Sequence, residues 1–325
     1  MSKVKKRLIV AGSILLALIL FLSVWYFGAF YPNFKSTKRF AIPGLKEGFV
    51  PQGMSRADNF GMWLISGYMA DGSKRRVYKV RESDGFTTYF TLKNTQEDKI
   101  FGHLGGIASN GDNVWIATEG FVLCLNMSDV IAAPNGGEVS VSDKFDSGTQ
   151  ASFCFANDEY FIVGEFYRKG GFEIEGHQFT RESDNTVNHA YAICYKIESE
   201  QQYGLSTQPP FVLSIPDQVQ GICLTRSGKI VLSTSYGLPS SKILICDFIE
   251  SLLRTDGAVN ILGFNNVNLY VLGNDDIKEK IKAPCMSEGI DYYNGEVYIL
   301  FESACKKYNM VTRTRTKNVL SIELT

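Results

Sequence analysis

Four glutamates and a histidine stand at points of this sequence where acid–base or metal chemistry could take place. Glu119, Glu165 and Glu302 each stand at the end of a short, mainly apolar run, and His103 and Glu288 each precede a glycine-containing one. His103 and Glu288 are the candidate catalytic residues, because imidazole and carboxyl groups exchange protons near neutral pH once their surroundings tune them. Glu119, Glu165 and Glu288 are the candidate metal ligands, since carboxylate oxygens suit a hard cation such as Ca²⁺.

Amide and aromatic side chains at the same points complete a candidate ligand-binding set. Its members are Gln52, Glu119, Glu165, Tyr167, Gln220, Tyr236 and Glu302. If they converge in space, crowded carboxyl groups would raise one another's pKa and could act as general acid and base, or the group could bind a ligand or metal ion. The structural alternative is that these glutamines and glutamates hydrogen-bond backbone amides of neighbouring repeats and hold the fold together.

These candidates belong to a segment that recurs along the chain. The segment consists of a small or polar residue, a glycine and an apolar residue, and an apolar strand follows shortly after it. The five copies are Gln52-Gly53-Met54, Gly105-Gly106-Ile107, Ala151-Ser152-Phe153, Gln220-Gly221-Ile222 and Glu288-Gly289-Ile290. Repetition at intervals of about 45 to 70 residues indicates a repeat architecture rather than unrelated loops.

The repeats predict an all-β protein, a five-bladed β-propeller, and the long intervals leave room for a sixth blade. Each recurring segment is followed by short runs of β-branched and aromatic residues joined by Gly, Asn and Asp turns, about four strands per repeat. Adjacent strands of a blade are antiparallel, so the start of the first strand and the end of the second lie on one face, around the central channel. We therefore expect the candidate residues to meet at that channel face.

The order of the strands predicts how the ring closes. The last repeat supplies only three strands before Thr325, and one extra strand, 39–43, precedes the first repeat. We predict that strand 39–43 pairs with strand 318–324, because an unpaired edge is unfavourable. The outer strand of the fourth repeat is predicted at 267–272.

The first 32 residues form a separate segment. A basic head is followed by residues 8–32, which contain no charged residue and are long enough to cross a bilayer, for which about 20 residues suffice. Positive charge before the span predicts a cytoplasmic head and an extracytoplasmic domain over 33–325. We expect an uncleaved, single-pass signal-anchor in the cell membrane, in contact with lipid through residues 8–31; a cleaved signal peptide is the alternative.

Composition argues against one class of partner. The 325 residues include 33 basic and 34 acidic side chains, a net charge of -1. So balanced a charge predicts no nucleic-acid partner. The sequence also lacks a nucleophile elbow, a zinc-protease helix motif and a phosphate-binding loop.

The cysteines predict buried thiols and one candidate disulfide. There are seven, and none forms a closely spaced pair typical of zinc sites. Five lie within apolar strand patterns, which is typical of small buried hydrophobes. Cys285 and Cys305 instead lie in connections of the last repeat that open on the channel face, so they are the candidate disulfide of an extracytoplasmic domain.

The connection 305–317 carries five basic residues and opens on the same face as the glutamates. They are Lys306, Lys307, Arg313, Arg315 and Lys317. Arginines there could form paired hydrogen bonds with an anionic group of a ligand, and a solvated loop is the alternative. His177 and His189, in or beside the polar insertion 168–188, are expected to be solvated.

The recurring segments, together with Ser233–Gly237 and Phe301–Ser303, resemble those of secreted or membrane-anchored bacterial β-propellers in the neighbourhood of NHL-type and gluconolactonase-like propellers. The resemblance covers roughly residues 40–325 and carries no catalytic residue over. Propeller lactonases hold a divalent metal in the channel with Glu, Asn and Asp. Glu119 and Glu288 could imitate the glutamates, but this chain lacks the matching Asn and Asp residues at its repeat starts.

Three hypotheses of function follow. The first is a membrane-anchored extracytoplasmic propeller that binds a small ligand, a metal ion or a protein partner at the channel face. The second is a metal-assisted hydrolase or lactonase that uses the channel glutamates and His103. The third is a non-catalytic envelope scaffold. Fold analogy alone does not choose between them.

Overall fold

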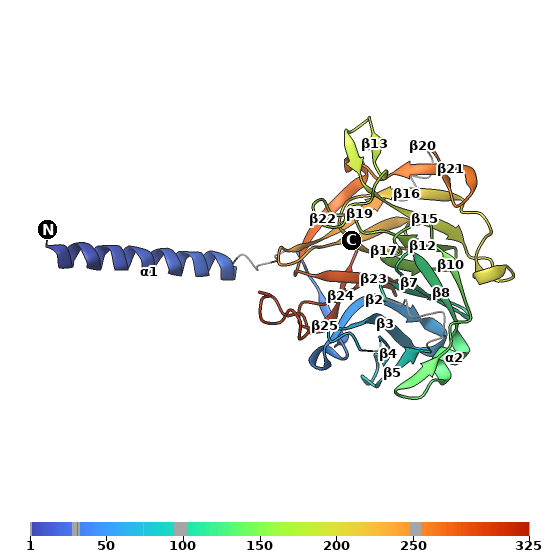
Figure 1. Cartoon of the computed structure of the whole chain (residues 1–325), viewed down its shortest axis with the longest axis horizontal. Coiled ribbons are helices and arrows are strands. Elements are labelled where there is room, and N and C mark those ends of the chain that lie inside the picture. The colour runs from blue at the N-terminus through green and yellow to red at the C-terminus, as the bar shows by residue number, and fades with distance from the viewer. Residues whose placement is uncertain are drawn as a thin grey trace.

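The structure is a computed structural model that shows a long N-terminal helix and an all-β domain (Figure 1). It describes residues 2–27, 31, 33–73, 75–93, 103–247 and 255–324. Within the predicted membrane segment, Met1, residues 28–30 and Pro32 therefore lie outside the described residues. Helix α1 (Lys3–Phe27) is long and apolar enough to cross a membrane, and an N-terminal signal sequence has the same properties.

The all-β domain is a five-bladed β-propeller, which confirms the predicted fold class (Figure 1). Each blade has four antiparallel strands, which are named in order from the channel outward. Blade 1 contains β2 (Phe49–Ala57), β3 (Met62–Met69), β4 (Arg76–Arg81) and β5 (Thr87–Leu92); blade 2 contains β6 (Ile107–Asn110), β7 (Asn113–Thr118), β8 (Phe121–Asn126) and β10 (Asp143–Asp146). Blade 3 contains β11 (Phe153–Ala156), β12 (Tyr160–Gly164), β15 (Ala190–Lys196) and β16 (Phe211–Ile215); blade 4 contains β17 (Val219–Leu224), β18 (Lys229–Thr234), β19 (Ser241–Asp247) and β22 (Ile277–Ala283). Blade 5 contains β23 (Ser287–Tyr293), β24 (Glu296–Phe301), β25 (Asn318–Glu323) and β1 (Thr37–Ala41).

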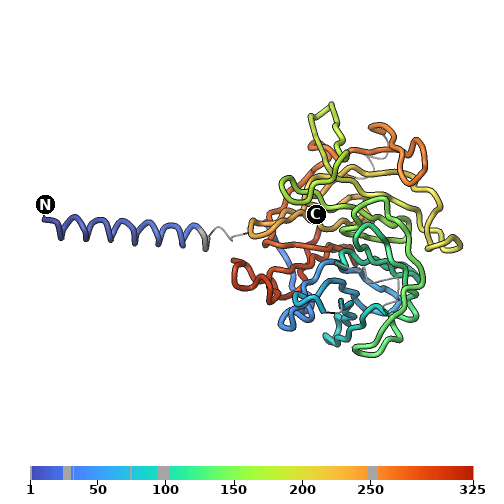
Figure 2. The backbone as a smooth tube through the Cα atoms, viewed as in Figure 1, coloured from blue at the N-terminus to red at the C-terminus, as the bar shows by residue number. Residues whose placement is uncertain are grey.

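Strand β1 is the outermost strand of the last blade, so the two ends of the domain pair with each other. It runs antiparallel to β25, with Thr37 opposite Ser321 and Ala41 opposite Asn318, and the N-terminal and C-terminal ends of the propeller meet at this blade (Figure 2). The Arg39 side chain strengthens the pairing, because its Nε donates to Ser321 Oγ at 2.7 Å. The ring is therefore closed by hydrogen bonds between its first and last strands.

Blades 1 and 3 are extended by additional strands, and one prediction about them is wrong. Strand β9 (Gly137–Val139) pairs in parallel with β5, while β21 (Phe264–Val271) pairs in parallel with β16 and carries β20 (Gly257–Ile261) on its other edge. The sequence predicts segment 267–272 as the outer strand of blade 4, but β22 holds that position. The apolar pattern of β21 is compatible with the open edge of either blade. The strand pattern of β22 is hard to recognise in the sequence, because its lysines and glutamate are exposed.

The remaining elements are short. They are the helix α2 (Met127–Ala132), the hairpin strands β13 (Phe179–Arg181) and β14 (Thr186–Asn188), and the 3₁₀ turns η1 (Leu45–Glu47), η2 (Asp58–Phe60), η3 (Gln202–Gly204) and η4 (Asn274–Asp276).

The recurring glycines are explained by the crowding of the innermost strands around the channel. A Cβ atom built on Gly106 would lie 2.0 Å from the backbone N of Cys154, and one on Gly289 would lie 2.8 Å from the Cα of Gly53. Gly53 in turn faces Gly106, with 2.7 Å between its built Cβ and the Gly106 Cα. Neighbouring inner strands thus touch backbone to backbone, and no side chain fits between them.

Large aromatic side chains join neighbouring blades. Trp63 of blade 1 packs on Tyr298 of blade 5 with ring centroids 4.5 Å apart, and Trp115 of blade 2 packs on Phe161 of blade 3 at 5.1 Å. Both tryptophans are fully buried. Each such side chain contributes roughly 1.5–3 kcal/mol or more by leaving water, so the blades are held in fixed mutual positions.

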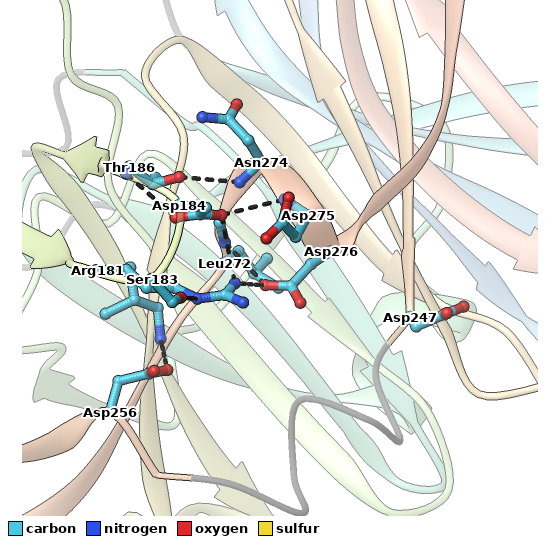
Figure 3. A network of polar contacts seen from close by, with 12 residues as sticks. Arg181, Ser183, Asp184, Thr186, Asp247, Asp256, Leu272, Asn274, Asp275 and Asp276 are labelled. Carbon is cyan, nitrogen blue, oxygen red and sulfur yellow. Dashed lines mark hydrogen bonds and ion pairs between the residues drawn. The ribbon is translucent and has the colours of Figure 1, made fainter.

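The insertion between β12 and β15 is anchored to the turn η4 by a polar network (Figure 3). Arg181 donates to Asp276 Oδ2 at 2.5 Å, and Asp184 accepts the backbone N–H of Asp275 at 3.1 Å. Thr186 Oγ1 also accepts the N–H of Asn274 at 2.9 Å. The hairpin β13–β14 is therefore held against blade 4, and with it the chain segment that leads into it.

Candidate functional site

A cavity of about 800 Å³ lies where the inner strands begin, at one mouth of the central channel. Inner-strand starts and second-strand ends from all five blades contribute to its lining. Of the residues predicted from the sequence, it is lined by Gln52, His103, Glu119, Gln220, Tyr236, Glu288 and Glu302. Residues far apart in the chain meet there because every blade presents the same two strand ends to the channel.

Glu288 and Glu302 form a hydrogen-bonded carboxyl pair in this cavity. Glu288 is only 3% exposed and donates to the Glu302 carboxylate. Burial raises the pKa of Glu288 well above its ordinary value, and the negative charge of Glu302 adds to the effect. Burial also raises the pKa of Glu302, to about 7, although Gln52 and Lys307 oppose that rise. Because two carboxylates in contact repel each other, Glu302 loses its proton only near neutral pH and the pair still keeps one proton, on Glu288, at neutral pH.

Gln52 connects this pair to His103. Its Nε2 donates to Glu302 Oε2 at 3.0 Å and to the Pro51 carbonyl at 2.8 Å, so its Oε1 is left to accept from His103 Nε2 at 2.8 Å. His103 is therefore protonated at Nε2, and its Nδ1 is the proton acceptor. These contacts join side chains of three blades. The structural alternative considered from the sequence was hydrogen bonds from such side chains to backbone amides of neighbouring repeats.

The imidazole of His103 is held in its neutral form. The ring packs on Tyr68 with centroids 4.0 Å apart. His103 keeps solvent-accessible surface at the cavity mouth, yet the protein atoms around the ring lower its pKa by desolvation, and the positive charges of Lys307 and Arg75 lower it further. At neutral pH the ring is therefore a neutral imidazole, which can accept a proton and is not an imidazolium that could act as a strong acid.

Three of the nine described non-glycine residues with positive φ lie at the rim of the cavity. Glu119, Ala151 and Met286 all line it and all have left-handed backbone conformations, with φ values of 44°, 46° and 59°. Such conformations cost non-glycine residues of the order of 1–3 kcal/mol. At Glu119 the hairpin turn between β7 and β8 requires this conformation, because Glu119 and Gly120 are the two residues between the paired Thr118 and Phe121. The Glu119 carboxylate has no hydrogen-bond partner among the residues that the structure describes, and it faces the cavity space.

An aromatic wall combines Tyr236, which was predicted from the sequence as a ligand-binding residue, with two phenylalanines that were not anticipated, Phe166 and Phe172. Phe172 and Tyr236 are 53% and 39% exposed, and both rings contact Phe166, at centroid distances of 5.4 and 6.3 Å. The guanidinium of Arg168 stacks on Tyr236 at 3.9 Å. The only signal in the sequence was the pair of phenylalanines flanking Arg168 in an otherwise polar insertion.

Lys307 is another cavity residue that the sequence left undecided. Its Nζ donates to the Tyr68 hydroxyl at 2.7 Å, which holds one end of the basic connection 305–317 at the cavity wall. Glu173 and Tyr308 also line the cavity. The sequence of the connection contains no signal that distinguishes Lys307, which lines the cavity, from the other basic residues of the loop.

Glu165 does not join the other glutamates. It is fully buried on the side of β15, where its Oε1 accepts the N–H of Tyr191 at 3.1 Å and lies 2.7 Å from His177 Nδ1. Burial raises the pKa of Glu165 despite His177. The predicted solvation of His177 is therefore wrong, because the insertion folds back and seats this ring on Glu165.

The predicted metal ligands are consequently not assembled. Glu165 does not line the cavity that Glu119 and Glu288 share, and the described residues include no group of three or more His, Cys, Asp or Glu side chains that could hold a metal ion. The Ca²⁺ ion predicted from the sequence thus has no ligand group in the described part of the chain.

Tyr167 also lies outside the cavity. Its ring stacks on His189, with centroids 4.6 Å apart and planes at 17°, and His189 Nδ1 lies 3.1 Å from Asp217 Oδ1. The tyrosine is only 8% exposed, so it supports the base of the insertion rather than a ligand.

The candidate disulfide is not formed. All seven cysteines are buried free thiols. Cys285 Sγ lies 4.0 Å from the Thr314 carbonyl, while Cys305 is enclosed in a turn in which its carbonyl accepts the N–H groups of Tyr308 and Asn309. Burial raises the pKa of Cys305 to about 11. The connection 305–317 is therefore held by hydrogen bonds and not by a covalent link.

The opposite mouth of the channel has a second cavity, of about 600 Å³, lined by the turns between first and second strands. Asp291 is buried there and accepts the N–H groups of Arg56 and Tyr292, both at 2.7 Å. Burial raises its pKa to about 7. None of the predicted site residues lines this cavity.

Comparison with known proteins finds similarity of structure only. No family model and no curated protein sequence matches this chain. The PQQ-bound aldose sugar dehydrogenase from Streptomyces coelicolor is 14% identical, with 82% of this chain and 76% of that chain covered at a TM-score of 0.45. The calcium-binding protein regucalcin from Agrobacterium tumefaciens is 9% identical, with 88% and 93% covered at a TM-score of 0.40. The glutaminyl cyclase from Myxococcus xanthus is 9% identical, with 89% and 96% covered at a TM-score of 0.43. Such similarities concern the propeller architecture and assign no function to the cavity.

Proposed function

We propose that this chain is a membrane-anchored, extracytoplasmic β-propeller that binds a small polar ligand in the cavity lined by Glu119 and Glu302. The observation that carries the proposal is the meeting of hydrogen-bonding side chains from all five blades around one cavity of about 800 Å³. A concave site of this size with a few convergent polar groups is typical of small-molecule binding. The carboxylate of Glu119, which lines that space and has no hydrogen-bond partner among the described residues, adds support.

The lining favours a ligand with hydroxyl or amino groups and one flat or apolar face. Glu119, Glu173 and Glu302 supply carboxylate oxygens, which accept hydrogen bonds, and among the described lining residues Lys307 supplies the positive charge. The exposed rings of Phe172 and Tyr236 offer a surface on which such a face can stack. A purely anionic ligand is disfavoured by this balance of charge.

Membrane anchoring is supported by α1 and by the charges that precede it. The helix is apolar over a length sufficient to span a bilayer, and the basic residues lie at its N-terminal end. This charge distribution favours an uncleaved anchor with the propeller outside the cytoplasm. Protease treatment of intact cells that produce the full chain should digest the propeller and leave the basic head protected, and the reverse pattern would contradict this topology.

Ligand binding is tested by thermal shift and native mass spectrometry of the detergent-solubilised full chain against a panel of sugars, polyols and amines. We expect a panel member to raise the melting temperature, and Glu119→Gln and Phe172→Ala to remove that rise. Asn59→Ala, at the opposite mouth, is the matched control and should retain it. A panel without any binding compound, or equal binding by Glu119→Gln and the native protein, would instead favour the scaffold hypothesis.

The carboxyl pair favours acid–base hydrolysis as a second candidate function. Glu288 and Glu302 hold one proton near neutral pH, and Gln52 links them to a neutral His103. A protonated and an ionised carboxyl group side by side are suited to general acid and general base catalysis. Hydrolysis of a lactone or phosphoester panel, lost in Glu302→Gln and in His103→Ala, would support this function. Unchanged turnover in His103→Ala would remove the histidine from the mechanism.

A further inference from the structure

The segment between α1 and β1, residues 28–36 (the tether), attaches to the propeller beside the cavity. Phe34 packs edge to face on Phe301, with ring centroids 6.5 Å apart and planes at 87°, and the next residue after Phe301 is the cavity residue Glu302. The Nζ of Lys282, at the end of β22 that leads toward the cavity, lies 5.5 Å from the Tyr31 ring centroid. Both contacts therefore hold the tether to the cavity side of the propeller.

The tether is too short to let the propeller turn over. Between Phe27, the end of α1, and Phe34, a fully extended chain spans at most about 25 Å. The cavity side thus stays close to the end of α1 whatever the path of the chain between them. Figure 1 shows α1 leaving the propeller on the side from which the dark red loop between β24 and β25 projects.

That loop, residues 303–317, presents an apolar tip flanked by positive charge. Thr312 folds it back, because its N–H donates to the Tyr308 carbonyl at 3.1 Å and its hydroxyl to the Ser303 carbonyl at 2.7 Å. Met310 and Val311, in the turn so formed, are 90% and 55% exposed. The loop contains five lysines and arginines, all exposed, and no acidic residue.

We infer that loop 303–317 docks on the surface of the bilayer that α1 spans, and that the propeller stands with its cavity mouth toward the lipid. Met310 and Val311 enter the boundary between headgroups and acyl chains, while Lys306 and Arg315 face anionic lipid phosphates. A charged surface attracts such groups over about 10 Å at 0.1 M salt, a distance that the loop can reach because the tether holds the cavity side near the end of α1. The inference rests on the proposed membrane anchoring and not on what the cavity binds.

The docking is tested with the full chain reconstituted in vesicles and labelled at one cysteine with an environment-sensitive fluorophore. All seven native cysteines are buried, so the exposed variants Met310→Cys and Asn59→Cys can be labelled selectively. Asn59 lines the opposite mouth and is the matched control. The vesicles contain phosphatidylcholine with or without phosphatidylglycerol, and lipids with a quencher on the acyl chain report contact with the bilayer.

We expect the label at position 310 to shift its emission to shorter wavelengths and to be quenched, more strongly with phosphatidylglycerol, while the label at 59 stays unquenched. Lys306→Glu and Arg315→Glu should weaken the quenching at 310. Protein that is retained by the vesicles but gives equal signals at 310 and 59 would overturn the docking and leave the anchor intact. Protein released by a carbonate wash would overturn the anchor, and the docking with it.

Discussion

The carboxyl group of Glu288 is hydrogen-bonded to that of Glu302; Glu288 lies in β23, and Glu302 directly follows the adjacent strand β24 of the same blade. Their contact keeps one proton in the cavity at neutral pH, because ionising both groups would place two negative charges side by side where protein atoms replace most of the surrounding water. Gln52 and His103 extend this contact across blades 1 and 2. The protonation state of the cavity is thus linked to the packing of three blades.

Stability should fall as pH rises through the range in which Glu302 loses its proton. The folded-state pKa of Glu302 is about 7, above the ordinary value of 4.5, so the folded state binds more protons than the unfolded chain between those values. The free energy of unfolding should therefore decrease between about pH 4.5 and 7, by about 1.4 kcal/mol for each pKa unit of difference.

Urea unfolding at pH 5 and pH 8 checks this prediction. The loss between the two pH values should be smaller in Glu302→Gln than in the native protein. Asp291→Asn is measured in parallel, because the pKa of that buried group is also raised to about 7 and contributes in the same direction. An identical pH dependence in the native protein and Glu302→Gln would contradict the assignment.

His103 should titrate below the ordinary histidine value of 6.5 and carry its proton at Nε2. Nitrogen-15 NMR of the imidazoles measures both properties in one titration. Replacing Lys307 by Met should raise the pKa of His103, because a nearby positive charge is removed. Gln52→Ala should weaken the Nε2 tautomer preference, since the accepting Oε1 is lost; an unchanged tautomer would show that Gln52 does not select it.

Gly106→Ala should strongly destabilise the propeller. The added Cβ would lie 2.0 Å from the backbone N of Cys154, so the inner strands of blades 2 and 3 would have to separate. Overpacking of this kind costs about 1–3 kcal/mol or more, and backbone cannot yield as a flexible side chain can. Gly171→Ala is the control, because only the end of the Arg168 side chain lies near its position. Denaturant midpoints of the two variants compare the effects, and equal stability would refute the packing explanation.

Arg181→Ala should release the hairpin β13–β14. The replacement leaves the carboxylate of Asp276, whose side chain is only 6% exposed, without its cation, and breaking a buried ion pair costs about 3–5 kcal/mol. Hydrogen exchange of the hairpin amides should accelerate, and ligand affinity should fall because Phe172 belongs to the same insertion. Glu182→Ala, an exposed neighbour, should change neither. Unaltered exchange in Arg181→Ala would mean that other contacts hold the hairpin.

The five recurring segments could be found in the sequence because each is under the same local constraint. Gly53, Gly106, Gly221 and Gly289 occupy equivalent places on inner strands that touch backbone to backbone, and Ser152 takes the fifth. The count of blades follows from their spacing. Residues beside these glycines, such as Gln52 and Glu288, were found with them, because strand starts are local features of the chain.

Only the tertiary structure decided which side chains face the cavity and which turn away. Glu119 and Glu165 follow equivalent strands, yet Glu165 is bound by the Tyr191 amide and His177 and does not line the cavity. The exposed wall formed by Phe172 and Tyr236 likewise depends on an insertion that is fixed by Arg181 to a turn far along the chain. Such orientations arise from contacts between distant segments, for which the periodicity of a single strand contains no information.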